Sequence, residues 1–272
     1  MELFDELKAQ IDGKNIRIVL PEGTEPRVLG AAARLQKEGI LVPVLLGQPE
    51  AIKSVALENN FDIDGIEIID MDNYPEFDDM VAAFVERRKG KVNDEEARKI
   101  LKDANFFGTM LTYMDKVDGM VSGAVHSTAD TVRPALQIVK TRPGVPRTSG
   151  SFLMLRGETR YLFADCAINI ELDAEGLAGM AKMFGIDPKV AMLSLSTKGS
   201  AKHDLITKVQ DATRMAKELA PDMVIDGELQ FDAAVSETVA KQKAPGSEVA
   251  GFANVFIFPS VDAGNIGYKI AQ

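Results

Sequence analysis

The segment from His126 to Arg133 contains the densest group of chemically active side chains in this sequence. Within six positions it carries three hydroxyls, one carboxylate and one imidazole, on His126, Ser127, Thr128, Asp130 and Thr131. Arg133 follows, and its planar guanidinium offers two parallel donors that match the oxygens of a phosphate group. The chemistry that these residue types favour is the binding of an anion.

The elements around this segment are expected to be a strand, a polar loop and a helix. Three preceding apolar residues are typical of a short buried strand: Val117, Met120 and Val121. Gly123 and Ala124 open a loop of small residues, and Pro134 fits the first turn of a helix. A loop after the carboxyl end of a strand directs free N–H groups toward one point, where open α/β sheets bind anions. An ordinary helix cap, with a Ser, Thr or Asp of this segment accepting from free amides, is the alternative interpretation.

Apolar runs that predict strands alternate along the chain with amphipathic segments that predict helices. The expected strands are Ile16–Leu20, Leu41–Leu46, Ile66–Ile69, Val190–Leu195, Met223–Ile225 and Asn254–Phe258, with a hairpin of Ser151–Leu155 and Tyr161–Ala164. The expected helices are Met1–Ala9, Glu22–Lys37, Pro49–Leu57, Phe77–Arg88, Asp94–Tyr113, Asp173–Phe184, His203–Leu219 and Asp262–Ala271. This alternation favours right-handed βαβ units and an α/β fold with mainly parallel sheets.

Basic residues gather at two places in the first half of the chain. Arg87 and its basic neighbours end an expected helix, where cations interact favourably with the helix dipole. The second group consists of Arg133, Lys140, Arg142 and Arg147. It is either an anion-binding cluster or a set of charges exposed to solvent. The stretch Thr141–Ser149 is rich in proline, glycine and basic residues, which is typical of a linker between domains.

Cys166 and Asn169 follow the expected strand Tyr161–Ala164. A lone cysteine after an apolar strand usually packs in the core, and it acts as a nucleophile only beside an activating group. The two histidines of the chain, His126 and His203, are both distant from Cys166 in the sequence. The residues alone therefore favour a structural cysteine.

Two further polar stretches follow strands in the second half. Ser196–His203 contains Lys198 beside Gly199 but lacks the spacing of a phosphate-binding P-loop. Asp226–Phe231 is expected to be a loop with two acids, whose carboxylates either pair for acid–base chemistry or make capping and interdomain hydrogen bonds. The sequence shows no residues with metal-ligand spacing.

The composition is that of a globular protein. Hydrophobic residues make up 46% of the 272, enough for one large domain or two modest ones. The net charge is −10, and no basic stripe of the kind that binds nucleic acid is visible. A single cysteine excludes an internal disulfide and suits a reducing compartment. No apolar run is long enough to cross a bilayer and no leader follows Met1, so we expect a cytoplasmic protein without nucleic-acid or membrane partners.

Several blocks of the chain resemble, in the same order, those of the phosphate acetyltransferase (phosphotransacetylase) family. The segment Asp118–Lys140 is similar to the family signature and reads DGMVSGAVHSTADTVRPALQIVK. The likeness also covers RIVLPEGTEPRVLGAA near the start, then FADCAIN, LSLSTKGSAKHD, DGELQFDAA and NVFIFPSVDAGNIGYKIAQ. Ordered blocks along the whole chain are far more specific than one short motif.

The resemblance implies an enzyme that interconverts acetyl-CoA and phosphate with CoA and acetyl phosphate. It implies a homodimer of chains with two α/β/α domains, residues 1–145 and 146–272, mainly parallel sheets and an interdomain cleft. CoA is a substrate, and neither a cofactor nor a metal is required. The residues implied for binding the substrates, including CoA, are Arg87, His126, Ser127, Thr128, Thr131, Arg133, Cys166 and Asn169. Cys166 is expected near the site without forming an acyl-enzyme.

The resemblance also places part of the catalytic machinery in a C-terminal segment that returns to the first domain. A Ser–Arg pair and an Asp that deprotonates the thiol are expected beyond Gln272, so the catalytic residues are not assigned within residues 1–272. A phosphate butyryltransferase and a non-catalytic CoA-binding fragment are the alternative functions. A dehydrogenase is disfavoured, because PEGTEP rather than G-x-G-x-x-G follows the first strand.

Overall fold

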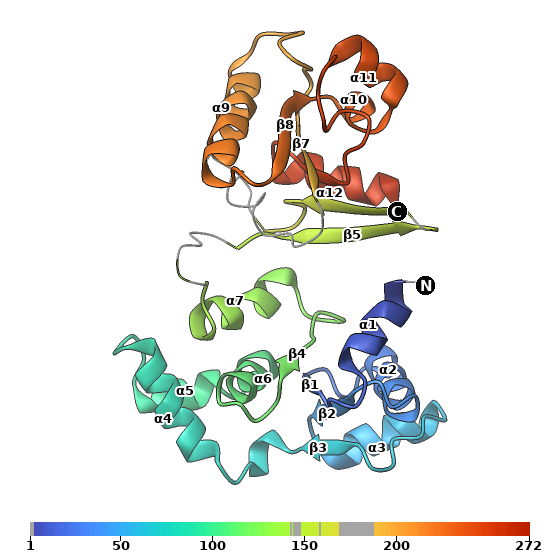
Figure 1. Ribbon diagram of the computed structural model, residues 1–272. Coiled ribbons are helices and arrows are strands. Elements are labelled where there is room, and N and C mark those ends of the chain that lie inside the picture. The colour runs from blue at the N-terminus through green and yellow to red at the C-terminus, as the bar shows by residue number, and fades with distance from the viewer. Residues whose placement is uncertain (1–2, 142, 144–147, 158, 169–187) are drawn as a thin grey trace. The chain divides into compact units, whose positions relative to one another are not determined.

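The N-terminal half of the chain forms a parallel sheet of four strands. The computed structural model describes residues 3–141, 143, 148–157, 159–168 and 188–272. The strands of this sheet lie in the order β3-β2-β1-β4 (Figure 1). Their bounds are β1 Arg17–Leu20, β2 Val42–Leu46, β3 Glu67–Ile69 and β4 Gly119–Met120. Because β1 and β4 are parallel neighbours, the segments that follow them leave the sheet at the same edge.

Helices cover both faces of this sheet. They are α1 Leu3–Ile11, α2 Pro26–Lys37, α3 Pro49–Glu58, the 3₁₀ turn η1 Met71–Asn73, α4 Phe77–Arg88, α5 Asp94–Ile100, α6 Ala104–Tyr113 and α7 Thr128–Ile138. On one face, Leu45 packs in a buried cluster with Leu29 of α2 and Ile52 of α3. On the other face, Val44 shares a cluster with side chains of α4, α5, α6 and α7, including Phe84. Alternation of in-facing residues along each strand thus produces three layers.

The C-terminal half forms a mixed sheet in the order β5-β6-β9-β7-β8. Its strands are β5 Ser151–Arg156, β6 Thr159–Ala164, β7 Lys189–Leu193, β8 Val224–Leu229 and β9 Val255–Ile257. The hairpin of β5 and β6 is antiparallel, as predicted, and the other pairings are parallel. The helices are α9 Asp204–Leu219, α10 Phe231–Val235, α11 Glu237–Lys243 and α12 Val261–Ala271. One face packs on α9 and the other on α10, α11 and α12.

The predicted α/β class with mainly parallel sheets is confirmed. By its internal contacts the chain divides into two compact units, Met1–Lys140 and Thr141–Gln272. The predicted boundary between residues 145 and 146 falls outside the described residues and stays a prediction, as does the interdomain cleft. The predicted helix Asp173–Phe184 and most of the predicted linker also lie outside them.

The predicted start of the second helix at Glu22 is wrong. The helix α2 begins at Pro26, where the missing N–H of proline costs nothing because that donor has no partner inside the helix. Glu25 caps this end by accepting the N–H of Arg27 at 3.4 Å. Glu22 therefore lies in the turn between β1 and α2, at the edge of the sheet, and not on a helix.

The predicted single helix Asp94–Tyr113 is two helices. The Asp103 carboxylate accepts the N–H groups of Asn105 and Phe106, at 2.9 and 3.1 Å, and so starts α6 as a new helix. A side-chain oxygen that binds the first free amides is the usual signal of a helix start. The predicted helix is therefore divided into α5, Asp94–Ile100, and α6, Ala104–Tyr113.

The boundaries around the His126–Arg133 segment also differ from the prediction. Strand β4 has only two residues, and Val121 is 62% exposed because it already lies in the loop. Helix α7 starts at Thr128, so Pro134 lies inside it and not in its first turn. The reason is that Ser127 caps the helix by accepting the N–H of Asp130 at 3.2 Å.

The predicted loop Asp226–Phe231 is wrong for its first part, because Asp226 to Leu229 belong to β8. Backbone pairing with β7 continues to Leu193 and Leu229, past a shift in register after Met192. The two acids of this stretch are therefore held on a buried strand. The predicted acid–base or capping roles must accordingly be judged from their contacts.

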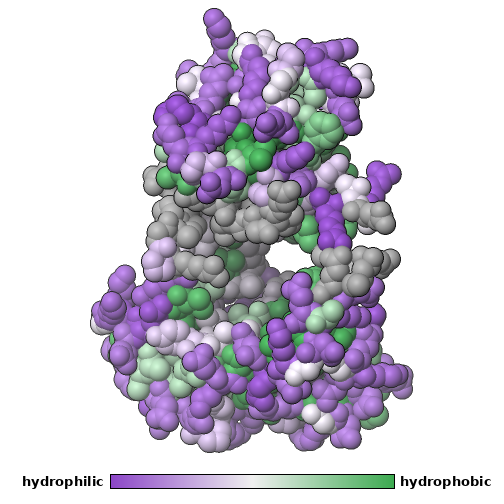
Figure 2. All heavy atoms as spheres, viewed as in Figure 1, coloured by the Kyte–Doolittle hydropathy of each residue, from purple (hydrophilic) through white to green (hydrophobic). Residues whose placement is uncertain are grey.

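The face of each unit that Figure 2 shows is mainly polar. Hydrophilic side chains cover most of the face of each unit that Figure 2 shows. Among the described helices, none combines the length and the apolar character needed to span a bilayer.

Candidate functional site

The Glu22 carboxylate lies inside the loop that follows β4. Its Oε2 accepts the N–H groups of Gly123 at 3.1 Å and Ala124 at 2.8 Å. Its Oε1 accepts those of Val125 at 2.8 Å and His126 at 3.1 Å, and His126 Nδ1 lies 2.7 Å from the same oxygen. The sequence predicts that amides of this loop face a bound anion. These four amides instead bind a carboxylate of the chain itself.

The charge of Glu22 is stabilised by this ring of donors. Burial of its side chain, which is 2% exposed, raises the pKa because it penalises the charged form. Hydrogen bonds from the amides of Val125 and Ala124 and from His126 outweigh burial and lower the pKa to about 2. Gly123 adopts a φ of +111°, which lets the loop curl around the carboxylate and suits glycine. Glu22 is therefore an anion at neutral pH.

The first turn of α7 is held by the side chains that the sequence singles out. Ser127 Oγ donates to Asp130 Oδ2 at 2.7 Å while it accepts the Asp130 N–H. The Thr131 hydroxyl donates to the carbonyl of Ser127 at 3.1 Å. The alternative interpretation, a helix cap, is thus right for Ser127. Both hydroxyls position the helix start in the structure described.

A set of donors remains at the start of α7. Among the described residues, the first-turn amides of Thr128 and Ala129 and the Thr128 hydroxyl have no hydrogen-bond partner. The ring atom His126 Nε2 has no partner there either and is available to a ligand, but it is not counted among these donors. Arg133 is one turn further along the helix. Its side chain is 58% exposed, and its Nη2 lies 3.9 Å from Asp130 Oδ1. The positive end of the helix dipole adds to these groups. This part of the site can therefore bind an anion such as a phosphate group.

Arg87 lies at the other end of α7. Its Nε donates to the carbonyl of Ile138 at 2.5 Å and its Nη2 to that of Val139 at 2.9 Å. The guanidinium also stacks over Tyr113, 5.0 Å from the ring centroid. A helix of 11 residues is about 16 Å long, so within this unit Arg87 is far from the His126–Thr131 segment. Arg87 binds the C-terminal carbonyls of α7, and its predicted role toward CoA stays a prediction.

Cys166 follows β6 and is fully buried. Burial, and to a lesser degree the neighbouring Asp165, raises the pKa of its thiol to about 12. The Asp165 carboxylate accepts the N–H groups of Ala167 and Ile168, at 2.8 and 3.0 Å, and thereby shapes the turn. A protonated, enclosed thiol agrees with the expectation that Cys166 is no nucleophile. Asn169 lies outside the described residues.

The native thiol of Cys166 is expected not to react with a thiol reagent at pH 8. Its buried sulfur is protonated and out of contact with solvent, and the thiolate is the reactive species. Titration with a chromogenic disulfide should show no rapid reaction in buffer and one thiol per chain in denaturant, because the sequence has one cysteine. Rapid reaction of the native protein would contradict the buried placement.

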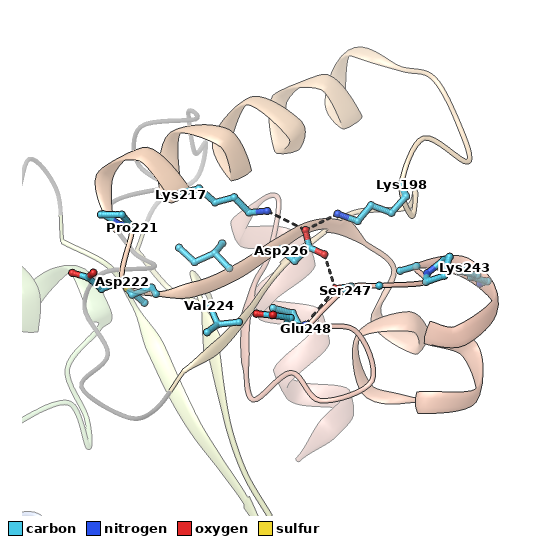
Figure 3. Close-up of a pocket in the computed structure, with 15 residues that line it drawn as sticks. Lys198, Lys217, Pro221, Asp222, Val224, Asp226, Lys243, Ser247 and Glu248 are labelled. Carbon is cyan, nitrogen blue, oxygen red and sulfur yellow. Dashed lines mark hydrogen bonds and ion pairs between the residues drawn. The ribbon is translucent and has the colours of Figure 1, made fainter.

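A second charged cluster lies around Asp226 on β8. Asp226 Oδ1 lies 2.5 Å from Lys198 Nζ and 3.4 Å from Lys217 Nζ, and the Ser247 hydroxyl donates to Oδ2 at 2.5 Å. Figure 3 shows the two lysines reaching Asp226 from different sides of a cavity of about 900 Å³. Burial raises the pKa of Asp226, but hydrogen bonds from Lys198 and Ser247 hold it below the usual range. This carboxylate is an ion-pair partner and not a free base.

Glu228 holds the predicted polar loop Ser196–His203. Its Oε1 accepts the Gly199 N–H at 2.6 Å and the Ser196 hydroxyl at 3.0 Å, and its Oε2 accepts from Gln210 at 3.2 Å. The two acids of β8 thus bind different partners and do not form a pair for acid–base chemistry. In both units, a buried carboxylate from a neighbouring segment binds a strand-to-helix loop.

Glu22 is the residue of this site that the sequence did not reveal. Helical spacing over Glu22–Lys37 assigned it to the start of a helix. The signal that points to it is its place in PEG directly after β1, together with Pro26, which marks the true helix start. Its contacts span more than 100 positions, so no local pattern contains them.

Comparisons with known proteins identify the family. A profile of the family described as phosphate acetyl/butaryl transferase matches residues 2–272, so the chain belongs to that family of acyltransferases. It is 56% identical over 283 residues to a phosphate acetyltransferase of Staphylococcus epidermidis, covering 100% of this chain and 86% of that protein. It is 55% identical over 278 residues to one of Bacillus subtilis, with the same coverage. The predicted family and enzyme class are confirmed.

A solved structure agrees with these sequence relatives. The crystal structure of a phosphotransacetylase from Streptococcus pyogenes matches with a TM-score of 0.93 and 54% identity. The match covers 100% of this chain and 86% of that one. The close relatives are thus phosphate acetyltransferases in both comparisons, which supports the predicted function.

Proposed function

We propose that this protein is a phosphate acetyltransferase, which transfers an acetyl group reversibly between CoA and inorganic phosphate. Membership of the family and the names of its close relatives support the reaction. The observation that carries the proposal within this chain is the set of donors at the start of α7, next to a loop anchored by Glu22. Such a site suits the phosphate group of acetyl phosphate.

The proposed chemistry is direct attack of CoA on the acetyl carbonyl. The thiol loses its proton to a base, since free thiol attacks poorly. The sulfur then forms a bond to the carbonyl carbon, the bond between that carbon and the phosphate oxygen breaks, and phosphate leaves with the electron pair. The leaving phosphate accepts hydrogen bonds from the amides of Thr128 and Ala129 and from the guanidinium of Arg133, which stabilise its negative charge. The base and the Ser–Arg pair that the resemblance implies are not assigned within residues 1–272.

The residues predicted to bind substrates fall into groups according to the hydrogen bonds and ion pairs that they make. His126, Thr128 and Arg133 have groups available to a ligand, whereas Ser127 and Thr131 hold the helix start. Arg87, Cys166 and Asn169 are proposed near CoA on the strength of the resemblance. CoA is a substrate in this scheme, and the proposed attack of its thiol uses neither a cofactor nor a metal.

We further propose a cytoplasmic homodimer. Strand β5 is an edge of its sheet and carries half-exposed apolar side chains, including Phe152, Leu153 and Leu155. An apolar edge strand that faces water favours association, and a second copy of the chain would cover it. The reducing compartment that a single free cysteine suits supports the cytoplasmic placement.

Thioester formation from CoA and acetyl phosphate is expected to be rapid with this protein, with butyryl phosphate assayed in parallel. The absorbance of the thioester bond measures the rate directly. Faster turnover of acetyl phosphate supports the acetyltransferase, and faster turnover of butyryl phosphate supports the butyryltransferase alternative. Binding of CoA without turnover of either acyl phosphate would favour a CoA-binding fragment and contradict the proposal.

A further inference from the structure

The two histidines of this chain hold their Nδ1 atoms in opposite hydrogen-bonding environments. His126 Nδ1 faces an acceptor, because it lies 2.7 Å from Glu22 Oε1. His203 Nδ1 faces a donor, because it accepts the backbone N–H of Leu205 at 3.2 Å. A neutral imidazole carries one proton, and its position follows from these contacts. The proton belongs on Nδ1 in His126 and on Nε2 in His203.

Glu22 leaves His126 no other tautomer. Its carboxylate is ionised, since its pKa lies at about 2, and an ionised carboxylate has no proton to donate. Its other four hydrogen bonds with the described residues come from backbone amides, which cannot reverse their direction. His126 Nδ1 must therefore donate to Oε1. The imidazole side chain is 29% exposed, and its Nε2 has no partner among the described residues.

We propose that Glu22 is a positioning residue of the substrate site, which fixes His126 as the Nδ1–H tautomer so that the neutral ring presents Nε2 to the substrate as a hydrogen-bond acceptor. The matching substrate group is a donor, such as the P–OH of monoprotonated phosphate or the S–H of CoA. The identity of the substrate rests on the proposed function, whereas the tautomer follows from the contacts of the side chains alone.

The backbone around the ring supports this assignment. His126 directly precedes Ser127, the cap of α7, and its own amide and the three before it are bound to Glu22. The main chain on both sides of the imidazole is thus held by hydrogen bonds, and the ring is held by its Nδ1. A group fixed in this way meets its substrate without first losing conformational freedom.

The direct test is ¹⁵N NMR of the two imidazole rings at a pH where both are neutral. The variant His203→Gln assigns the signals, since the chain has two histidines. We expect the proton on Nδ1 in His126 and on Nε2 in His203, which serves as the internal control. In Glu22→Gln we expect the His126 proton to shift toward Nε2, because a carboxamide accepts at one oxygen only. An Nε2–H tautomer of His126 in the wild type would overturn the proposal.

Kinetics test the function of this contact. Glu22→Gln is expected to lower kcat/KM for acetyl phosphate at least tenfold, the usual effect of losing a charge-assisted hydrogen bond. His126→Asn retains an amide donor near the position of Nδ1 but lacks Nε2. We expect it to keep a melting temperature near that of the wild type and to lose kcat/KM by a similar factor. Wild-type kcat/KM in His126→Asn, or in folded Glu22→Gln, would overturn the proposal.

A matched control separates positioning from stability. Asp103→Ala removes another carboxylate that binds backbone amides, at the start of α6. We expect a lower melting temperature with unchanged kcat/KM. If Glu22→Gln fails to fold, the proposal is still tested by the tautomer of His126 in the wild type and by the kcat/KM of His126→Asn. A wild type that forms no thioester would contradict the proposed function. The NMR experiment tests the tautomer of His126 independently of that result.

Discussion

Replacing Arg133 by alanine is expected to raise the Michaelis constant for acetyl phosphate about ten- to hundredfold. The guanidinium is 58% exposed, and its one ion pair with the described residues is weak, with 3.9 Å between Nη2 and Asp130 Oδ1, so it is available to a ligand. A charge-assisted, two-pronged contact with phosphate accounts for the size of the effect. Steady-state kinetics with acetyl phosphate as the varied substrate, at saturating CoA, measure it.

The stability of this variant should stay close to that of the wild type, because an exposed ion pair contributes about 0 to 1 kcal/mol. Arg133→Lys should recover part of the affinity, since it restores the charge but not the planar pair of donors. Arg214→Ala on α9 is the matched control, with a side chain 62% exposed and a 3.1 Å contact to Glu218. Unchanged kinetic constants in Arg133→Ala would show that Arg133 does not bind the phosphate group of the substrate.

Acidification is expected to remove about 3 kcal/mol of unfolding free energy through Glu22 alone. Its folded-state pKa is about 2, against an ordinary value of 4.5. A group with a lowered pKa stabilises the folded state fully above its unfolded pKa. That contribution is lost as the pH falls through the folded pKa, so the loss is expected between about pH 5 and pH 2. Urea unfolding at a series of pH values measures it.

Glu22→Gln supplies the reference for this measurement. The difference in unfolding free energy between wild type and variant should be largest near neutral pH, where Glu22 is charged and binds its donors. It should shrink toward zero near pH 2, where the protonated wild-type side chain resembles glutamine. A difference that does not vary with pH would show that the charge of Glu22 does not stabilise the loop.

Local sequence patterns were sufficient to predict a helix or strand whose bounds are set by its own residues. Phe77–Arg88 was predicted with the bounds it has, because apolar spacing and the basic last turn are both contained in it. The hairpin of β5 and β6 followed from two apolar runs around a short turn. Asp94–Tyr113 failed, because a capping side chain can restart a helix inside a continuous helical pattern.

The fate of the two acids of β8 was open in the sequence. Asp226 and Glu228 are two positions apart, which fits a loop, a cap or a catalytic pair equally well. Their roles depend on Lys198 and Gly199, almost 30 positions earlier, and on Ser247, about 20 positions later. Such contacts exist only once the strands are side by side. Burial then makes each carboxylate bind whatever donors surround it.

The sequence by itself determined the α/β class, the family and the segment that holds the candidate site, because strand and helix periods and the ordered family blocks are written along the chain. Only the tertiary structure decided which groups of that segment are available to a ligand. Parallel pairing of β1 and β4 brings Glu22 to the loop, where its buried charge binds four amides and the Nδ1 of His126. A buried charge requires donors from any part of the chain, and no sequence pattern states which ones will surround it.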